Sequence, residues 1–172
     1  MRLITRLVIA FCSGFLSAAC AHASSVDDRV ATLLPWVGNQ TGYSVAYVQP
    51  TVSFDKIDDI NKRYYGQAYA GQKDIEAYTV GTHITVRDDY QSPRDDYIVV
   101  HELVHVLQFE HGDIDIDGKL VAYSTKFQCL NQTEHQAYEV QGRYVDLTGL
   151  GWKADLVRFA FSAQCPTYPG MH

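Results

Sequence analysis

Residues 101–105 read His-Glu-Leu-Val-His, the HExxH pattern, which places two imidazoles and a carboxylate within five positions. On a helix, His101 and His105 lie one turn apart on the same face and can hold one metal ion. Glu102 leans toward that face, where a carboxylate can take a proton from metal-bound water. The pattern therefore predicts one zinc ion bound by both histidines, with Glu102 as the general base of a hydrolytic reaction.

A catalytic zinc ion usually has a third protein ligand, and two residues compete for that place. Glu134 begins the run Glu-His-Gln-Ala farther along the chain. His111 fits the spacing HExxHxxGxxH, but Gln108 stands where that pattern needs a glycine to turn the chain. We expect Glu134 to be the third ligand, with His111 and then Glu139 as the alternatives.

HExxH followed by Glu134-x-x-Ala137 resembles the gluzincins, the thermolysin-like zinc metallopeptidases, and small bacterial HExxH proteins. The resemblance covers roughly residues 75–150 and implies zinc bound by His101, His105 and Glu134, with Glu102 acting on a peptide or protein substrate.

The gluzincins often carry an aspartate four residues after the ligand glutamate, where it supports a ligand histidine. Here that place is Tyr138, so Glu139 or Asp146 is expected to give the support. The chain is short for the family. Two alternatives therefore stay open: a zinc hydrolase of non-peptide amides such as cell-wall components, and a non-catalytic secreted metal-binding domain.

The segment around HExxH predicts a buried helix. Ser92 is a good N-cap, Pro93 fits the first turn, and Asp95 completes a capping box. Apolar residues on several faces indicate a central position in the fold, and Gly112 is a plausible stop.

Alternating residues predict the strands that lie beside this helix. Residues 75–80 and 83–87 are separated by Gly81-Thr82, which indicates a β-hairpin. We expect the second of these strands to form a sheet edge beside the metal, where an extended peptide could add as a further strand. Short strands are also expected at 44–49 and 52–54.

Helical periodicity accounts for much of the remaining chain. A first helix from Val26 should kink or end at Pro35, and others are expected at 55–65, 133–147 and 152–162. The predicted fold is α+β: a minimal zincin-like domain with a small twisted sheet, a buried HExxH helix and a glutamate helix.

Residues 1–23 have the composition of a secretory signal peptide, cleaved near Ala23, which leaves a single domain at 24–172. We therefore expect a secreted or periplasmic protein without a membrane span, and no lipid anchor at Cys20. In such a compartment Cys129 and Cys165 should pair as a disulfide.

The mature chain is acidic. Without Arg2 and Arg6 it keeps 12 of the 14 basic residues against 20 acidic residues, a net charge near −8. Such a charge disfavours nucleic acid and anionic membrane surfaces as partners.

Asp113, Asp115 and Asp117, followed by Gly118, match the first half of an EF-hand calcium loop. The twelfth position of that loop should be a bidentate glutamate, and here it is Ser124. We therefore expect an acidic, solvated loop or strand edge rather than a calcium site.

Overall fold

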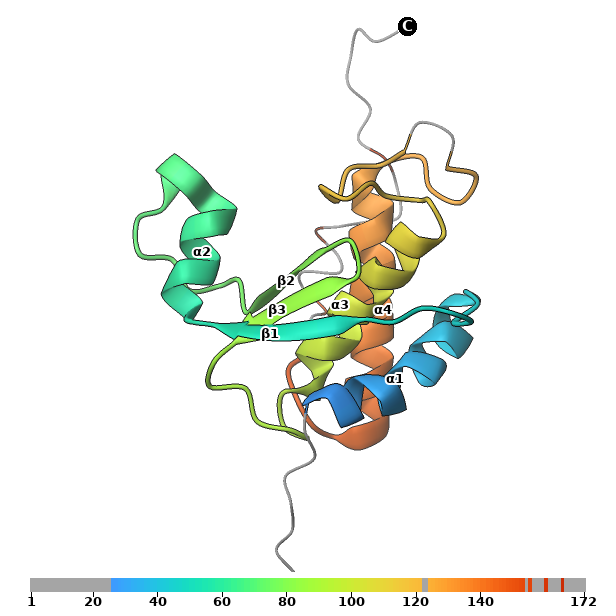
Figure 1. Cartoon of the computed structure of the whole chain (residues 1–172), viewed down its shortest axis with the longest axis horizontal. Helices are drawn as coiled ribbons and strands as arrows, with labels where there is room; N and C mark the ends of the chain where they lie inside the picture. The colour runs from blue at the N-terminus through green and yellow to red at the C-terminus, as the bar shows by residue number, and fades with distance from the viewer. Residues whose placement is uncertain (1–25, 122–123, 154, 156–159, 161–164, 166–172) are drawn as a thin grey trace, which may run out of the picture.

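The computed structural model describes residues 26–121, 124–153, 155, 160 and 165. Its described elements form a small α+β fold, as predicted, with helices packed against a three-stranded sheet (Figure 1). In chain order they are α1 (Val26–Thr41), β1 (Thr51–Asp55), α2 (Ile57–Tyr65), the short 3-10 turn η1 (Gly66–Ala68), β2 (Ala77–Val80), β3 (His83–Arg87), α3 (Asp96–Glu110) and α4 (Leu130–Thr148).

The sheet has the strand order β1-β3-β2. β2 and β3 form the predicted antiparallel hairpin, while β1 pairs with β3 in parallel, with Val52 opposite Ile84. The expectation that residues 83–87 form a sheet edge is wrong. Because β1 occupies the second side of β3, the strand at the edge beside α3 is β2.

Residues 44–49 are not a strand, contrary to expectation. Tyr47 has a φ of 70° and is almost fully exposed, and the Val48 N–H donates to the Val45 carbonyl at 3.2 Å. This turn ends any extended run, so the strand in this region is limited to β1.

Helix α1 continues past Pro35 and ends at Thr41, so of the two outcomes expected at the proline, a kink or an end, the helix end is wrong. Leu33, Leu34 and Val37 are buried on the face that packs against the core. Burial of these side chains on both sides of the proline outweighs the hydrogen bond that proline cannot make.

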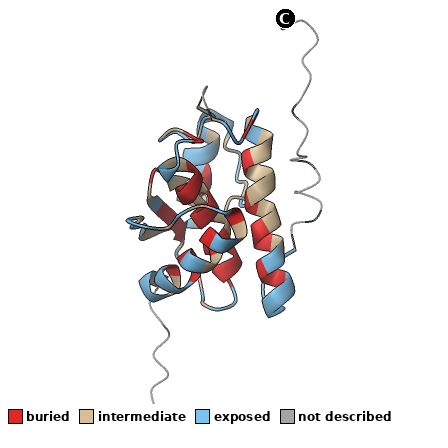
Figure 2. Cartoon of the chain, turned by 90° about the vertical axis from the view of Figure 1, so that its right-hand side faces the viewer, coloured by how far each residue is buried: buried red, intermediate tan, exposed pale blue. Residues whose placement is uncertain are grey.

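Helix α3 lies at the centre of the molecule, between the sheet, α1 and α4. Figure 2 shows that the buried residues are concentrated in the interior of the molecule. Val99, Leu103 and Val106 of α3 are fully buried. Such burial on several faces agrees with the apolar pattern of the sequence.

The helix begins at Asp96 rather than at the predicted cap Ser92. The Asp95 carboxylate accepts the backbone N–H of Gln91 at 2.9 Å, which closes a separate turn before the helix. Its C-terminal end agrees with prediction, because Gly112 follows with a φ of 73°.

The fully buried carboxylate of Asp96 joins α3 to its neighbours. Arg29 of α1 forms an ion pair with it, and the Nε of Arg29 donates to Oδ2 at 2.8 Å. The hydroxyls of Tyr90 and Tyr144 also donate to this carboxylate. One buried anion, paired and hydrogen-bonded, therefore connects the first turn of α3 with α1 and α4.

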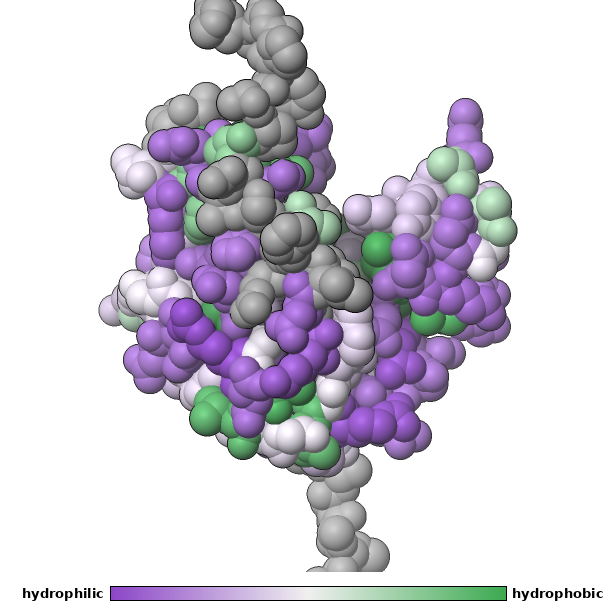
Figure 3. Space-filling view, turned by 180° about the vertical axis from the view of Figure 1, so that it is seen from behind, coloured by the Kyte–Doolittle hydropathy of each residue, from purple (hydrophilic) through white to green (hydrophobic). Residues whose placement is uncertain are grey.

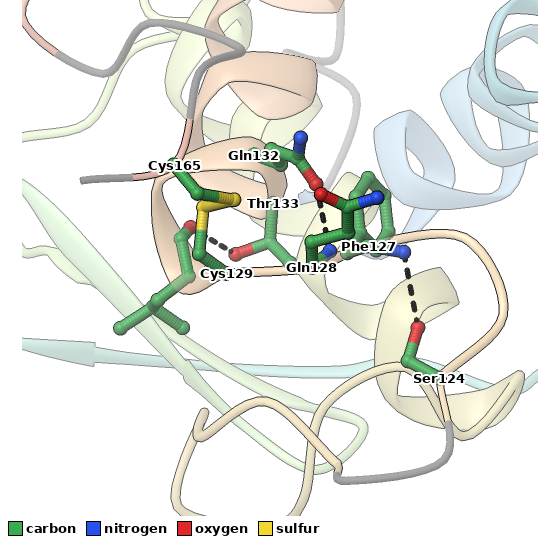
Figure 4. Close-up of a disulfide and its surroundings, with 8 residues drawn as sticks. Ser124, Phe127, Gln128, Cys129, Gln132, Thr133 and Cys165 are labelled. Carbon is green, nitrogen blue, oxygen red and sulfur yellow. Dashed lines mark hydrogen bonds between the residues drawn. A yellow bond between two sulfur atoms is a disulfide. The ribbon is translucent and has the colours of Figure 1, made fainter. Parts of the chain in front are cut away.

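Cys129 and Cys165 form the predicted disulfide immediately before α4 (Figure 4). Most of the helix predicted at 152–162, the predicted signal peptide and Cys20 lie outside the described residues. Within the part of the chain that the structure describes, none of the helices has the length and apolar character needed to cross a membrane.

Candidate metal centre

Helices α3 and α4 bring together the three residues predicted as zinc ligands. His101 and His105 face α4 from consecutive turns of α3, and Glu134 faces them from the first turns of α4. One potential ligand atom from each lies within 4.8 Å of the others. Among the described residues this is the one cluster of histidine, cysteine and acidic side chains with such geometry.

The distances between these atoms agree with a tetrahedral zinc site. Ligands about 2.0–2.2 Å from zinc would lie about 3.3–3.6 Å from one another. The Nε2 atoms of His101 and His105 are 3.1 Å apart. Oε2 of Glu134 lies 3.6 Å from Nε2 of His101, and the other oxygen, Oε1, lies 3.4 Å from Nε2 of His105. The three side chains therefore form a cluster close to the size that a divalent metal ion needs.

The electrostatics of the cluster favour a cation. Burial alone would raise the pKa of the Glu134 carboxyl, but the charge of His105 and its contacts with both histidines outweigh burial and hold that pKa well below its ordinary value. A carboxylate that stays ionised at this depth is a ready ligand for a divalent ion.

Two buried glutamines contact the outer nitrogens of the histidines. Nδ1 of His101 lies 3.0 Å from Oε1 of Gln141, and Nδ1 of His105 lies 2.8 Å from Oε1 of Gln108. The expectation that Glu139 or Asp146 gives this support is wrong, because Glu139 pairs with His135 and Asp146 with Lys153.

Glu102 is buried beside the cluster, with 6 % of its surface exposed. The Thr79 hydroxyl, on the edge strand β2, donates to Oε2 of Glu102 at 2.7 Å. This hydrogen bond fixes one carboxylate oxygen. The site also reaches solvent, because 29 % of the Glu134 side chain is exposed.

Tyr138 covers one side of His101, with ring centroids 4.4 Å apart and planes inclined by 60°. Burial raises the pKa of its phenol, and the charges of Glu134 and Glu102 add to that effect. The Tyr138 side chain is therefore a neutral aromatic wall of the site.

The side chain of His111, the alternative third ligand, contacts the loop after α1 instead of the cluster. Its ring stacks on Tyr43 with centroids 4.7 Å apart, and its Nε2 lies 2.8 Å from the Ser44 carbonyl oxygen. His111 therefore holds the loop after α1, and Glu134 takes the place of third candidate ligand.

The aspartates after α3 point to different partners. Asp113 accepts hydrogen bonds from Tyr43 and Ser124, whereas Oδ1 of Asp115 accepts the backbone N–H groups of Asp117 and Lys119. Asp113 is buried, so the expected solvated acidic loop is limited to Asp115 and Asp117.

Three residues of the site are not predicted by the sequence patterns: Thr79, Gln108 and Gln141. Gln108 could be found as a polar residue within the apolar run of α3, three residues after His105. Gln141 lies two turns after Glu134 and so shares its helix face.

A family model, the eCIS core domain, matches residues 63–113. The matched segment contains the β2–β3 hairpin and all of α3, and therefore His101, Glu102 and His105, but it ends before Glu134. It covers 51 of the 172 residues. Neither the curated proteins nor the solved structures contain a significant match to this chain.

Proposed function

We propose that the protein is a zinc-dependent hydrolase of the gluzincin type that cleaves amide bonds in peptides. The observation that carries this proposal is the convergence of His101, His105 and Glu134 at ligand distances, beside the buried carboxylate of Glu102. Three protein ligands leave one tetrahedral position for water or substrate, as catalytic zinc sites do.

When bound, zinc supplies a Lewis acid that polarises a substrate carbonyl and lowers the pKa of a water molecule. Glu102 then accepts the proton of the attacking water and transfers it to the leaving amine. The hydrogen bond from Thr79 holds one oxygen of Glu102, so the other oxygen is the one that takes the proton.

The sheet edge supports a peptide as substrate. β2 pairs with β3 on one side, and among the described strands none pairs with its other side. The face opposite to that of Figure 1 has a recess between α2 and the rest of the molecule (Figure 3). An extended chain in this recess could pair with β2 beside Glu102.

A location outside the cytoplasm accords with three observations. The N-terminal sequence has the composition of a signal peptide, Cys129 and Cys165 are bonded, and the matched family is one of extracellular contractile injection system proteins. Disulfides persist in such oxidising compartments.

The test compares Glu102→Gln with the wild type and with Glu110→Gln, a control at the exposed end of the same helix. Each zinc-loaded protein is incubated with a mixed peptide library and a panel of non-peptide amides, and products are identified by mass spectrometry. Zinc content is measured in parallel.

We expect wild type and Glu110→Gln to cleave peptides, and Glu102→Gln to bind zinc without cleaving. Cleavage of the non-peptide amides alone would replace the substrate class. Zinc binding without any cleavage would leave a metal-binding domain and overturn the proposal, as would full activity of Glu102→Gln.

A further inference from the structure

We infer that Gln108 and Gln141 are the positioning residues of the metal centre. Each amide oxygen accepts the Nδ1–H of one ligand histidine and so leaves the Nε2 lone pair for the ion. The inference rests on the proposed zinc site. It adds an explanation of how the histidine rings are oriented and how strongly their Nε2 atoms bind the ion.

The orientation of the Gln108 amide follows from its partners. Nε2 of Gln108 donates to the Thr133 carbonyl at 3.0 Å and to Oε1 of Gln136 at 3.1 Å. Both partners are acceptors, so the nitrogen of the amide must face them and Oε1 must face His105. Gln108 is fully buried, so bulk solvent cannot replace these contacts.

The same argument applies to Gln141, which is 3 % exposed. Its Nε2 donates to the Trp152 carbonyl at 3.5 Å, so its Oε1 faces Nδ1 of His101. An amide oxygen can only accept. Both imidazoles must therefore carry a proton on Nδ1, and in their neutral form each presents an Nε2 lone pair toward Glu134.

The pair of tautomers explains why a cation belongs between the rings. With Nδ1 protonated, two neutral histidines turn lone pairs toward each other across the 3.1 Å between their Nε2 atoms. That contact is unfavourable unless a positive centre, either a metal ion or a proton on one Nε2 atom, lies between the rings. The glutamines therefore orient both Nε2 atoms so that a metal ion can replace the proton between the rings.

The neutrality of the glutamines affects ligand strength. Carboxylate partners raise the basicity of a ligand histidine, whereas an amide leaves it lower. Glu134 is then the one anionic ligand of the three, and the bound ion keeps more of its charge for substrate. A carboxylate at position 141 should accordingly tighten zinc binding.

The test measures zinc binding and tautomers, and so does not depend on hydrolysis. The variants Gln141→Met, Gln141→Glu and Gln108→Met are compared with the wild type and with Gln40→Met. Gln40 is a matched control because its amide oxygen accepts a hydrogen bond from Arg143 of α4 but contacts no histidine. Zinc affinity is measured by competition with a chromophoric chelator. Nitrogen-15 NMR of the zinc-loaded proteins identifies the ring nitrogen that carries the proton.

We expect each Gln→Met change at 108 or 141 to weaken zinc binding about 10-fold to 100-fold. Gln141→Glu should bind at least as tightly as wild type, Gln40→Met should not differ from it, and wild type should show Nδ1–H on both histidines. Wild-type affinity in Gln141→Met, or equal weakening in Gln141→Met and Gln141→Glu, would refute the inference while leaving the zinc site intact. A wild-type protein that binds no zinc would instead overturn the proposed function.

Discussion

Zinc and a proton should compete for His105, so metal affinity should depend on pH. In the metal-free protein, burial disfavours a charged imidazole, but the charge of Glu134 and its hydrogen bond outweigh burial and raise the pKa of His105 to about 9. Zinc binds the neutral ring, so the proton must leave first. Raising the pH therefore strengthens binding until the pKa of His105 is passed.

The magnitude follows from that pKa. At pH 7, about two units below it, deprotonation costs about 2.7 kcal/mol, which weakens the apparent affinity roughly 100-fold relative to a deprotonated site. Between pH 6.5 and 8 the affinity should rise about 10-fold per pH unit, with close to one proton released per ion from His105.

Calorimetry in two buffers with different protonation enthalpies counts the released protons at pH 7. NMR titration of the chelator-treated protein follows His105 directly. Glu134→Gln should lower the pKa of His105, because its main charged partner is lost. Glu139→Gln, whose carboxylate pairs with His135 on the same helix, should not. Proton release near zero in the wild type, or equal effects of the two variants, would refute the reasoning.

Two further predictions concern the base and the disulfide. Thr79→Val should lower hydrolysis by about 10-fold to 150-fold with zinc content unchanged, because a hydrogen bond to a charged group is worth about 1.5–3 kcal/mol. Thr82→Val in the same hairpin is the control, and unchanged activity of Thr79→Val would count against a role in holding Glu102. Replacing both Cys129 and Cys165 by serine should lower the free energy of unfolding by about 4 kcal/mol, since the bond closes a separation of 36 residues. Urea denaturation measures that loss, and a change below about 1 kcal/mol would contradict it.

The sequence predicts which residues form the candidate metal cluster better than it predicts their surroundings. His101, His105 and Glu134 can be found because few residue types bind zinc and helical spacing restricts which of them can meet. The supporting residues are harder to find, since Gln108 and Gln141 have no titratable group and their role exists only when α3 and α4 are docked.

Errors in the predicted elements have local physical causes. Tyr47 adopts a positive φ inside an alternating run, and periodicity does not register such a turn. Pro35 stays within α1 because burial on both sides holds the helix together. The place of β3 at the centre of the sheet depends on its parallel partner β1, which is distant in sequence.

Contacts between α3 and α4 at two separate levels limit how these helices can move. Tyr144 contacts Asp96 at the start of α3, whereas Glu134 contacts His105 nine residues later. A helix held at two levels can neither slide along its neighbour nor rotate about its own axis without breaking one of the contacts. One residue inserted into α4 between Glu134 and Tyr144 would rotate these side chains relative to each other by about 100°. The spacing along α4 is therefore as much a part of the metal centre as its ligands, and length changes should be tolerated in the loop between the helices rather than within them.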